Sequence, residues 1–104
     1  MEGEYWICRV SMIPRDIKFL ALVNDLSGMI TIVSEEKVGE CIGPYKALVS
    51  EEMDPSTVGF LAEVSRKLAK AGIPIMVYAS FERDYVLVPS KLLEKALEVL
   101  AKGP

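Results

Sequence analysis

The 104-residue chain contains no histidine and no glutamine, and Asn24 is its only asparagine. Without histidine it lacks the side chain that most often serves as general base near neutral pH, so catalysis would need carboxylates, lysines or thiols. Because no nucleophile is paired with a base in the sequence, we expect that the protein is not an enzyme. Its charged residues are Glu, Lys, Arg and some Asp, a usage close to that of hyperthermophile proteins, and we expect a thermophilic source.

Cysteine is also scarce, with only Cys8 and Cys41 and no C-x-x-C motif. Two thiols cannot complete a tetrahedral metal site alone, and this spacing matches no redox or zinc motif. We interpret both as buried small apolar side chains, and a mutual disulfide is the alternative. We expect neither a metal nor another cofactor.

The chain has no excess of positive charge, because 12 lysines and arginines stand against 15 acidic residues, for a net charge of -3. A surface that binds nucleic acid or anionic lipid usually carries such an excess. No apolar run approaches the roughly 20 residues of a membrane helix, and Met1–Trp6 lacks the positive start of a secretory signal. We therefore expect a cytoplasmic protein without a nucleic-acid or membrane partner.

Glycine-rich phosphate loops are absent as well. Gly39 and Gly43 are not followed by Lys-Ser or Lys-Thr, and no G-x-G-x-x-G occurs, which excludes nucleotide binding by those routes. Apolar residues, in contrast, make up 51% of the chain, and the mean hydropathy is +0.29. This length and composition predict one compact domain.

The second half of the chain has the clearer pattern. Tyr45–Ser50 is short, apolar and rich in strand-forming residues, so it predicts a strand. Apolar residues then recur with helical spacing and predict a helix over Thr57–Ala71, which Gly72 ends in a left-handed conformation. The positions on its apolar face are Val58, Leu61, Val64 and Leu68.

Two more strands and a helix follow. Ile73–Ala79 predicts a strand whose beginning suits Pro74, and Tyr85–Val88 predicts its antiparallel partner. Apolar residues from Leu92 to Leu100 predict a second amphipathic helix that stops at Gly103-Pro104.

The resulting order, β-α-β-β-α, is a ferredoxin-like unit without its final strand. The first 42 residues predict three strands, Tyr5–Ser11, Phe19–Val23 and Met29–Ser34, which we expect to complete the sheet. Gly39–Pro44 is interpreted as a short connector. The prediction is an α+β fold with two helices on one face of an antiparallel sheet. Residues 1–42 pack on residues 43–104 in one cooperative globule.

The first candidate binding element is the start of the helix predicted over Thr57–Ala71. Helix N-termini expose backbone N–H groups that receive carboxylates or phosphates. Gly59 falls inside the predicted first turn, where glycine is unfavourable, so we expect a close approach to its backbone by a ligand or a neighbouring strand. Ser56, or Asp54 ahead of Pro55, is expected to cap the helix.

The second candidate is the predicted hairpin tip Ser80–Tyr85. Asp84 at a strand end can form a charge-assisted hydrogen bond with a ligand ammonium group. The alternative is a solvated turn carboxylate paired with Arg83.

Three segments of the second half together resemble the ACT-domain family. They are Asp54–Ala62 with its helix-start glycine, Leu68–Ile75 with L-A-x-x-G-I, and Ala79–Val88 with S-F-x-x-D-Y-x-L-V. The likeness covers about residues 43 to 102, and Met29–Glu35 matches more weakly. It is closest to the aspartokinase-type branch, which includes small stand-alone proteins and cytosolic arginine sensors.

The resemblance implies a small effector, commonly an amino acid, bound at an interface between two such units. Backbone amides near Thr57, Val58 and Gly59 would hold its carboxylate, and Asp84 would lie near its amino or side-chain end. The expected ligand-binding residues are Thr57, Val58, Gly59, Ser80, Phe81 and Asp84. We therefore expect a non-catalytic regulatory domain that binds an amino acid and works as a homodimer. The alternative is a structural or protein-interaction module with a degenerated ligand site.

Overall fold

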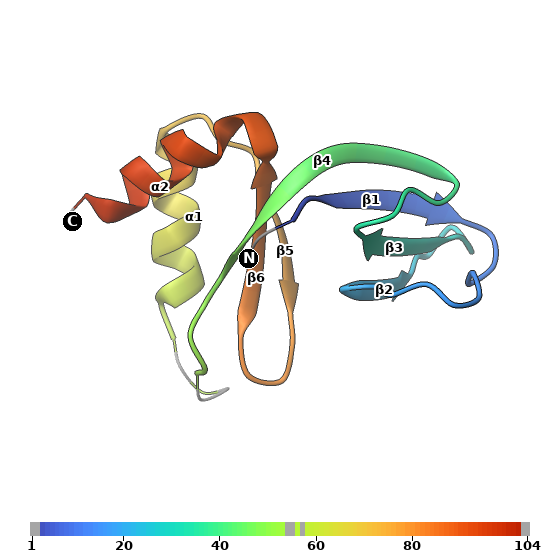
Figure 1. The fold of residues 1–104 in the computed structure, drawn as a ribbon. Coiled ribbons are helices and arrows are strands. Elements are labelled where there is room, and N and C mark those ends of the chain that lie inside the picture. Colours follow the sequence, from blue (N-terminus) through green and yellow to red (C-terminus); the bar gives the residue numbers. More distant parts are fainter. Residues whose placement is uncertain (1–2, 54–55, 57, 103–104) are drawn as a thin grey trace. The chain divides into compact units, whose positions relative to one another are not determined.

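The computed structural model describes residues 3–53, 56 and 58–102, and the chain divides into two compact units, residues 2–45 and residues 46–104 (Figure 1). The division falls three residues after the boundary expected at residue 42, within strand β4 (Glu40–Val49). Folding as one cooperative globule stays a prediction.

The N-terminal unit is antiparallel β structure. Its strands are β1 (Tyr5–Val10), β2 (Ala21–Asn24), β3 (Ile30–Ser34) and the first half of β4, in the spatial order β2-β3-β1-β4. The three strands predicted here are confirmed to within one or two residues at each end. Its core consists of Tyr5, Ile7, Cys8, Ile32 and Val33.

The interpretation of Gly39–Pro44 as a connector was wrong, because Glu40–Pro44 is the first half of β4. Its residues pair with β1 in a register that places Ile42 opposite Ile7 and Cys41 opposite Cys8. Glycine and proline in this stretch argued for a loop, yet the pairing with β1 provides the backbone partners that local sequence could not reveal.

The two cysteines form a disulfide, so the interpretation of Cys8 and Cys41 as separate buried thiols was wrong. Cys8 is indeed buried, with 1% of its surface exposed. The bond exists because the register of β1 against β4 brings two residues 33 positions apart in sequence directly opposite each other.

The C-terminal unit has the predicted β-α-β-β-α order. The rest of β4 is followed by α1 (Phe60–Lys70), β5 (Met76–Ala79), β6 (Asp84–Pro89), the 3-10 turn η1 (Ser90–Leu92) and α2 (Leu93–Ala101). The central strand of this unit is β6, with β4 and β5 on its two sides. This is the α+β arrangement expected for a ferredoxin-like unit that lacks its fourth strand.

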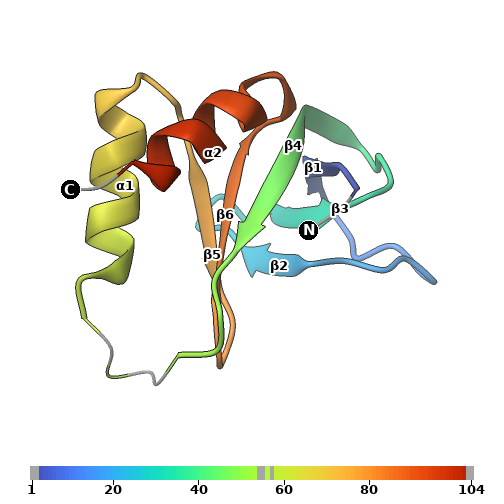
Figure 2. The same ribbon diagram turned by 60° about the vertical axis from the view of Figure 1, so that its left-hand side comes forward.

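Both helices cover the same face of this sheet (Figure 2). Leu68 of α1 and Ala96 of α2 are buried in one cluster with Val86 and Val88, which point to one face of β6 because strand side chains alternate. The expected placement of two helices on one face is therefore confirmed.

Two boundaries differ from the prediction. The first helix begins at Phe60 and not at Thr57, so Val58 lies outside the helix with 90% of its surface exposed. Strand β5 begins at Met76, two residues after Pro74, whose missing N–H cannot join the ladder with β6. Gly72 follows the helix with a φ of 75°, which confirms its expected left-handed conformation. The predicted stop at Gly103-Pro104 lies outside the described residues.

Candidate ligand-binding site

A cavity of about 360 Å³ lies in the C-terminal unit between the start of α1 and the β5–β6 hairpin. The helix start contributes mainly apolar residues, and the hairpin contributes charged ones. Its lining residues are Met53, Gly59, Phe60, Leu61, Ala62, Ala79, Ser80, Phe81, Glu82, Arg83 and Asp84.

The start of α1 presents backbone donors to this cavity. Gly59 is the N-cap, and its carbonyl accepts a hydrogen bond from the N–H of Glu63 at 3.0 Å. The N–H groups of Phe60, Leu61 and Ala62 belong to the first turn, which has no preceding turn of helix to accept them. Together with the helix dipole, they favour an anionic group in the cavity.

The expected capping by Ser56 was wrong, because Gly59 is the N-cap and makes no side-chain capping bond. Asp54 lies outside the described residues. Amides that could bind a carboxylate were expected near Thr57, Val58 and Gly59, whereas the first-turn amides of the observed helix belong to Phe60–Ala62.

Gly59 has a φ of 90°, in the left-handed region that favours glycine. A Cβ atom built there would meet nothing within 4 Å. A neighbouring strand consequently does not explain this glycine, and the backbone conformation alone accounts for it. The space beside its α-carbon is open on the side where a Cβ would lie.

The hairpin is held by hydrogen bonds of Ser80 across its turn. The N–H of Ser80 donates to the carbonyl of Arg83 at 2.9 Å, and its hydroxyl accepts from the N–H of Arg83 at 3.3 Å. The hydroxyl also lies 3.1 Å from the Arg83 carbonyl oxygen, to which it donates. Ser80 therefore shapes the turn that carries the charged residues of the cavity.

Asp84 is fixed by the segment that follows β4. Its backbone N–H donates to the hydroxyl of Ser50 at 2.8 Å, and its carbonyl accepts from the N–H of Ser50 at 3.0 Å. Further along the same segment, the N–H of Met53 donates to the carbonyl of Glu82 at 2.7 Å. The backbone of the hairpin is thus tied to residues 50–53 at two points.

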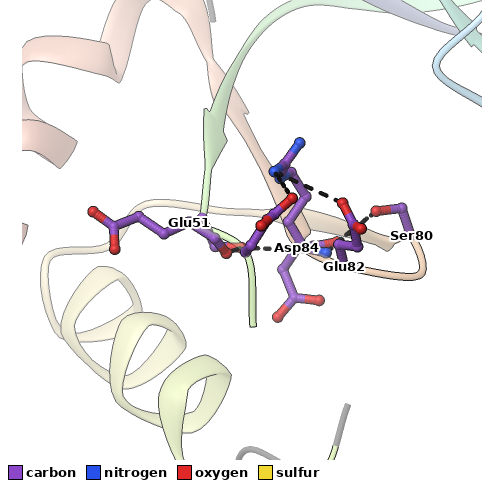
Figure 3. Close-up of polar contacts among 7 residues, drawn as sticks. Glu51, Ser80, Glu82 and Asp84 are labelled. Atoms are coloured by element: carbon purple, nitrogen blue, oxygen red, sulfur yellow. Dashed lines mark hydrogen bonds and ion pairs between the residues drawn. The ribbon is translucent and has the colours of Figure 1, made fainter. Parts of the chain in front are cut away.

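The ion pairs of the hairpin do not include the carboxylate of Asp84. Arg83 lies 3.5 Å from a carboxylate oxygen of Glu52 and 4.0 Å from one of Glu82, and Figure 3 shows the Asp84 carboxylate apart from these contacts. The alternative of a turn acid paired with Arg83 has no support among the ion pairs of the described residues. The half-buried Asp84 carboxylate is available to a cationic group in the cavity.

The structure brings together four of the six expected binding residues: Gly59, Ser80, Phe81 and Asp84 all line the cavity. Val58 is exposed next to Gly59, and Thr57 lies outside the described residues. Sequence reasoning missed Phe60, whose ring position depends on where the helix begins, and Ser50, whose role depends on pairing between β4 and β6. No local motif signals either residue.

A second cavity of about 390 Å³ in the same unit shares the residue Phe60. Its walls are mainly aliphatic, with Leu48, Val64 and Leu100 among them. The ammonium of Lys67 beside it lies 3.7 Å from Glu63 and donates to the carbonyl of Lys102 at 3.0 Å. Unlike the first cavity, it combines no helix N-terminus with an unpaired carboxylate.

The described residues contain no cluster of His, Cys, Asp and Glu that could hold a metal ion. None of the helices within the described ranges is long and apolar enough to cross a lipid bilayer. The first cavity combines the first turn of α1 with the charged residues of the hairpin, which suits a molecule with separate anionic and cationic groups.

The C-terminal unit is an α+β domain of ferredoxin-like topology with a cavity at the start of its first helix. The ACT domain family matches residues 47–102, more than half of the chain, and the chain belongs to that family. The expected family is thereby confirmed. The relation to its aspartokinase-type branch or to arginine sensors stays a prediction.

Two solved structures resemble nearly the whole chain. One is a protein of unknown function from Vibrio cholerae, described as a possible transport protein, with 25% identity over 96% of this chain and 83% of that one and a TM-score of 0.80. The other, from Agrobacterium tumefaciens, has 25% identity over 95% of this chain and 81% of that one, with a TM-score of 0.75. No curated protein matches the chain.

Proposed function

We propose that the protein is a non-catalytic regulatory ACT-domain protein that binds an amino acid in the cavity between α1 and the β5–β6 hairpin. The observation that carries this proposal is that the first-turn residues of α1 and Asp84 line one cavity. An α-carboxylate accepts hydrogen bonds from the amides, and an ammonium group pairs with Asp84.

The groups around the cavity support binding more than catalysis. Its ionisable residues are Glu82, Arg83 and Asp84, and two of these, Glu82 and Arg83, are occupied by the ion pairs of the hairpin. General acid–base chemistry needs a positioned group that exchanges protons near the working pH, and the chain contains no histidine.

A second copy of the chain fits the open side of the cavity in this proposal. Val58 and Phe81 lie beside or in the cavity with 90% and 87% of their surfaces exposed. Covering such side chains with a partner surface removes apolar area from water and encloses the ligand. The protein then works as a homodimer that reports the ligand to a separate target.

Thermal unfolding in the presence of each standard amino acid tests this function. A ligand at 100 times its dissociation constant stabilises the folded state by about 2.7 kcal/mol, which raises Tm by several degrees for a domain of this size. We expect one amino acid, or a few related ones, to do so. If none raises Tm at millimolar concentration, binding of this ligand class is refuted.

Matched glycine variants locate the site. Gly59 and Gly72 stand at opposite ends of α1, both have positive φ, and neither would place a Cβ near another atom. Valine at either position imposes a similar backbone penalty, since β-branched residues rarely adopt positive φ. We expect Gly59→Val to abolish the ligand-induced rise in Tm and Gly72→Val to retain it, with helical circular dichroism spectra for both. Equal retention would place the carboxylate elsewhere.

The exposed Val58 and Phe81 side chains also favour a second function, a protein-interaction module without a ligand. Asp84→Asn separates the two functions, because it removes the charge needed for an ammonium group while it preserves the shape of the surface. Loss of a ligand-induced Tm shift in this variant supports binding. A partner complex that forms equally well with Asp84→Asn and with no amino acid present supports the interaction module.

A further inference from the structure

The outer edge of β2 is a sheet edge without a partner among the described residues. Strand β2 pairs with β3 along Ala21–Asn24, and it comes first in the strand order of the N-terminal unit. Figure 1 shows it on the side of β3 away from β1. The backbone groups on its outer side can therefore pair with another chain.

Three features that normally prevent such pairing, namely charge, proline and a bulge, are missing from this edge, although β2 itself is only four residues long. The six residues Phe19–Asn24 include no charged residue and no proline, and the register between β2 and β3 runs without a bulge. Phe19 and Val23 are exposed over 48% and 42% of their surfaces. Natural edge strands are usually protected by a charged residue, a proline or a bulge as well as by short length, so an edge that lacks the first three points to a partner.

Opposite charges flank this uncharged run. Lys18 precedes it and Asp25 follows it, and both side chains are exposed. Hydrogen bonds from the Ser27 side chain and from its backbone N–H, which lies 3.2 Å from the Asp25 carboxylate, lower the pKa of Asp25. Asp25 is therefore negatively charged at neutral pH, and the edge is positive at one end and negative at the other.

Two copies of this edge bring opposite charges together in one relative orientation only. When two copies of the edge pair antiparallel, Lys18 of each lies at the end that carries Asp25 of the other. Parallel pairing would bring like charges together, which destabilises neighbouring strands. A two-fold axis perpendicular to the sheet produces the antiparallel arrangement and makes the same patch meet itself.

We propose that the outer edge of β2 is a self-association surface, where a second copy of this chain adds its own β2 in antiparallel orientation. A second copy is the partner that fits, because the edge carries opposite charges at its two ends and an uncharged run between them. This inference does not rest on the amino-acid site, since β2 belongs to the N-terminal unit and the cavity to the other.

Sedimentation velocity over a range of protein concentrations, at low ionic strength, tests the edge. Val23→Lys places a lysine on each copy of the edge, whereas Ile42→Lys places one on β4, where the exposed fraction of the wild-type side chain is 54%. We expect wild type and Ile42→Lys to associate through this edge in addition to any contact at the cavity, and Val23→Lys to lose the edge contact, with a dissociation constant for that step higher by about tenfold or more. Circular dichroism confirms that the variants are folded.

Charge reversal gives a test that does not depend on Val23. Lys18→Glu alone and Asp25→Lys alone bring like charges together in their homodimers, so both should associate about tenfold more weakly than wild type. A mixture of the two variants restores both opposite-charge pairs in the heterodimer. We expect the mixture to associate like wild type.

Three results would overturn the proposal. A wild-type protein that remains monomeric at every concentration means that the edge is bare or covered by a different protein. Association that is equally strong in Val23→Lys places the contact between copies elsewhere. Failure of the mixed variants to associate, while each remains folded, refutes the antiparallel arrangement. Amino-acid binding is measured on Val23→Lys as well. If this variant still binds the ligand, a failure of the edge proposal leaves the proposed function intact.

Discussion

Ser50 and Asp84 exchange two hydrogen bonds: the N–H of Asp84 donates to the Ser50 hydroxyl at 2.8 Å, and the N–H of Ser50 donates to the Asp84 carbonyl at 3.0 Å. The two residues are 34 positions apart in sequence. This pairing joins the end of β4 to the beginning of β6 and thereby sets where the Asp84 carboxylate stands. Ser50 positions Asp84 without lining the first cavity itself.

Ser50→Ala removes the acceptor of the partly buried Asp84 N–H. Leaving such a group without its partner costs about 1 kcal/mol, which corresponds to a fall in Tm of about 4–8 °C for a domain of this size. Calorimetry measures the change. Ser65→Ala is the control, because the Ser65 hydroxyl donates only to the carbonyl of Ala62 in its own helix. An equal fall in both variants would contradict a special role for Ser50.

Removing the disulfide between Cys8 and Cys41 should weaken the fold substantially. The bond closes a loop between residues 33 positions apart, and the loop-entropy relation assigns it about 3–4 kcal/mol. Chemical denaturation of wild type with and without reductant measures this difference. The Cys8→Ala/Cys41→Ala variant should match reduced wild type and should not respond to reductant. An equal unfolding midpoint for oxidised and reduced wild type would show that the bond does not contribute.

Alanine substitutions at Gly39 and Gly28 test how tightly the backbone is packed at these two positions of the N-terminal unit. A Cβ at Gly39 would lie 2.5 Å from the backbone oxygen of Arg9, whereas a Cβ at Gly28 would meet nothing within 4 Å. Both residues have positive φ. We expect Gly39→Ala to lower the free energy of unfolding by about 2–4 kcal/mol, and Gly28→Ala by about 1 kcal/mol. The reverse ranking in urea denaturation would contradict this packing.

The order of the C-terminal unit followed from local sequence because its signals are periodic and bounded by glycine and proline. The helical spacing of Leu61, Val64 and Leu68 predicted the buried face of α1 correctly. Its beginning was misplaced because Gly59 adopts a positive φ that no periodicity reveals, and the helix could start only after it. The first-turn amides that could bind a ligand therefore belong to Phe60–Ala62 and not to the residues predicted from the sequence.

Features that depend on pairing between distant strands could not be predicted in the same way. The disulfide needed the register of β1 against β4, and the Ser50–Asp84 contact needed β4 beside β6. The chain from Gly39 to Pro44 looked like a connector because glycine and proline disfavour strands, yet tertiary pairing overrides that preference. The position of Asp84 in the candidate site was recognised from the family motif, while its support was visible only in the structure.

The central claim is that an amino acid binds between the first turn of α1 and Asp84. A two-dimensional amide NMR titration, with the amino acid that gives the largest rise in Tm, tests it most directly. We predict that the largest shifts occur at the backbone amides of Phe60, Leu61, Ala62 and Asp84, and that Gly59→Val removes them. Largest shifts in the N-terminal unit, or around Val64 and Leu100 of the second cavity, would contradict the account.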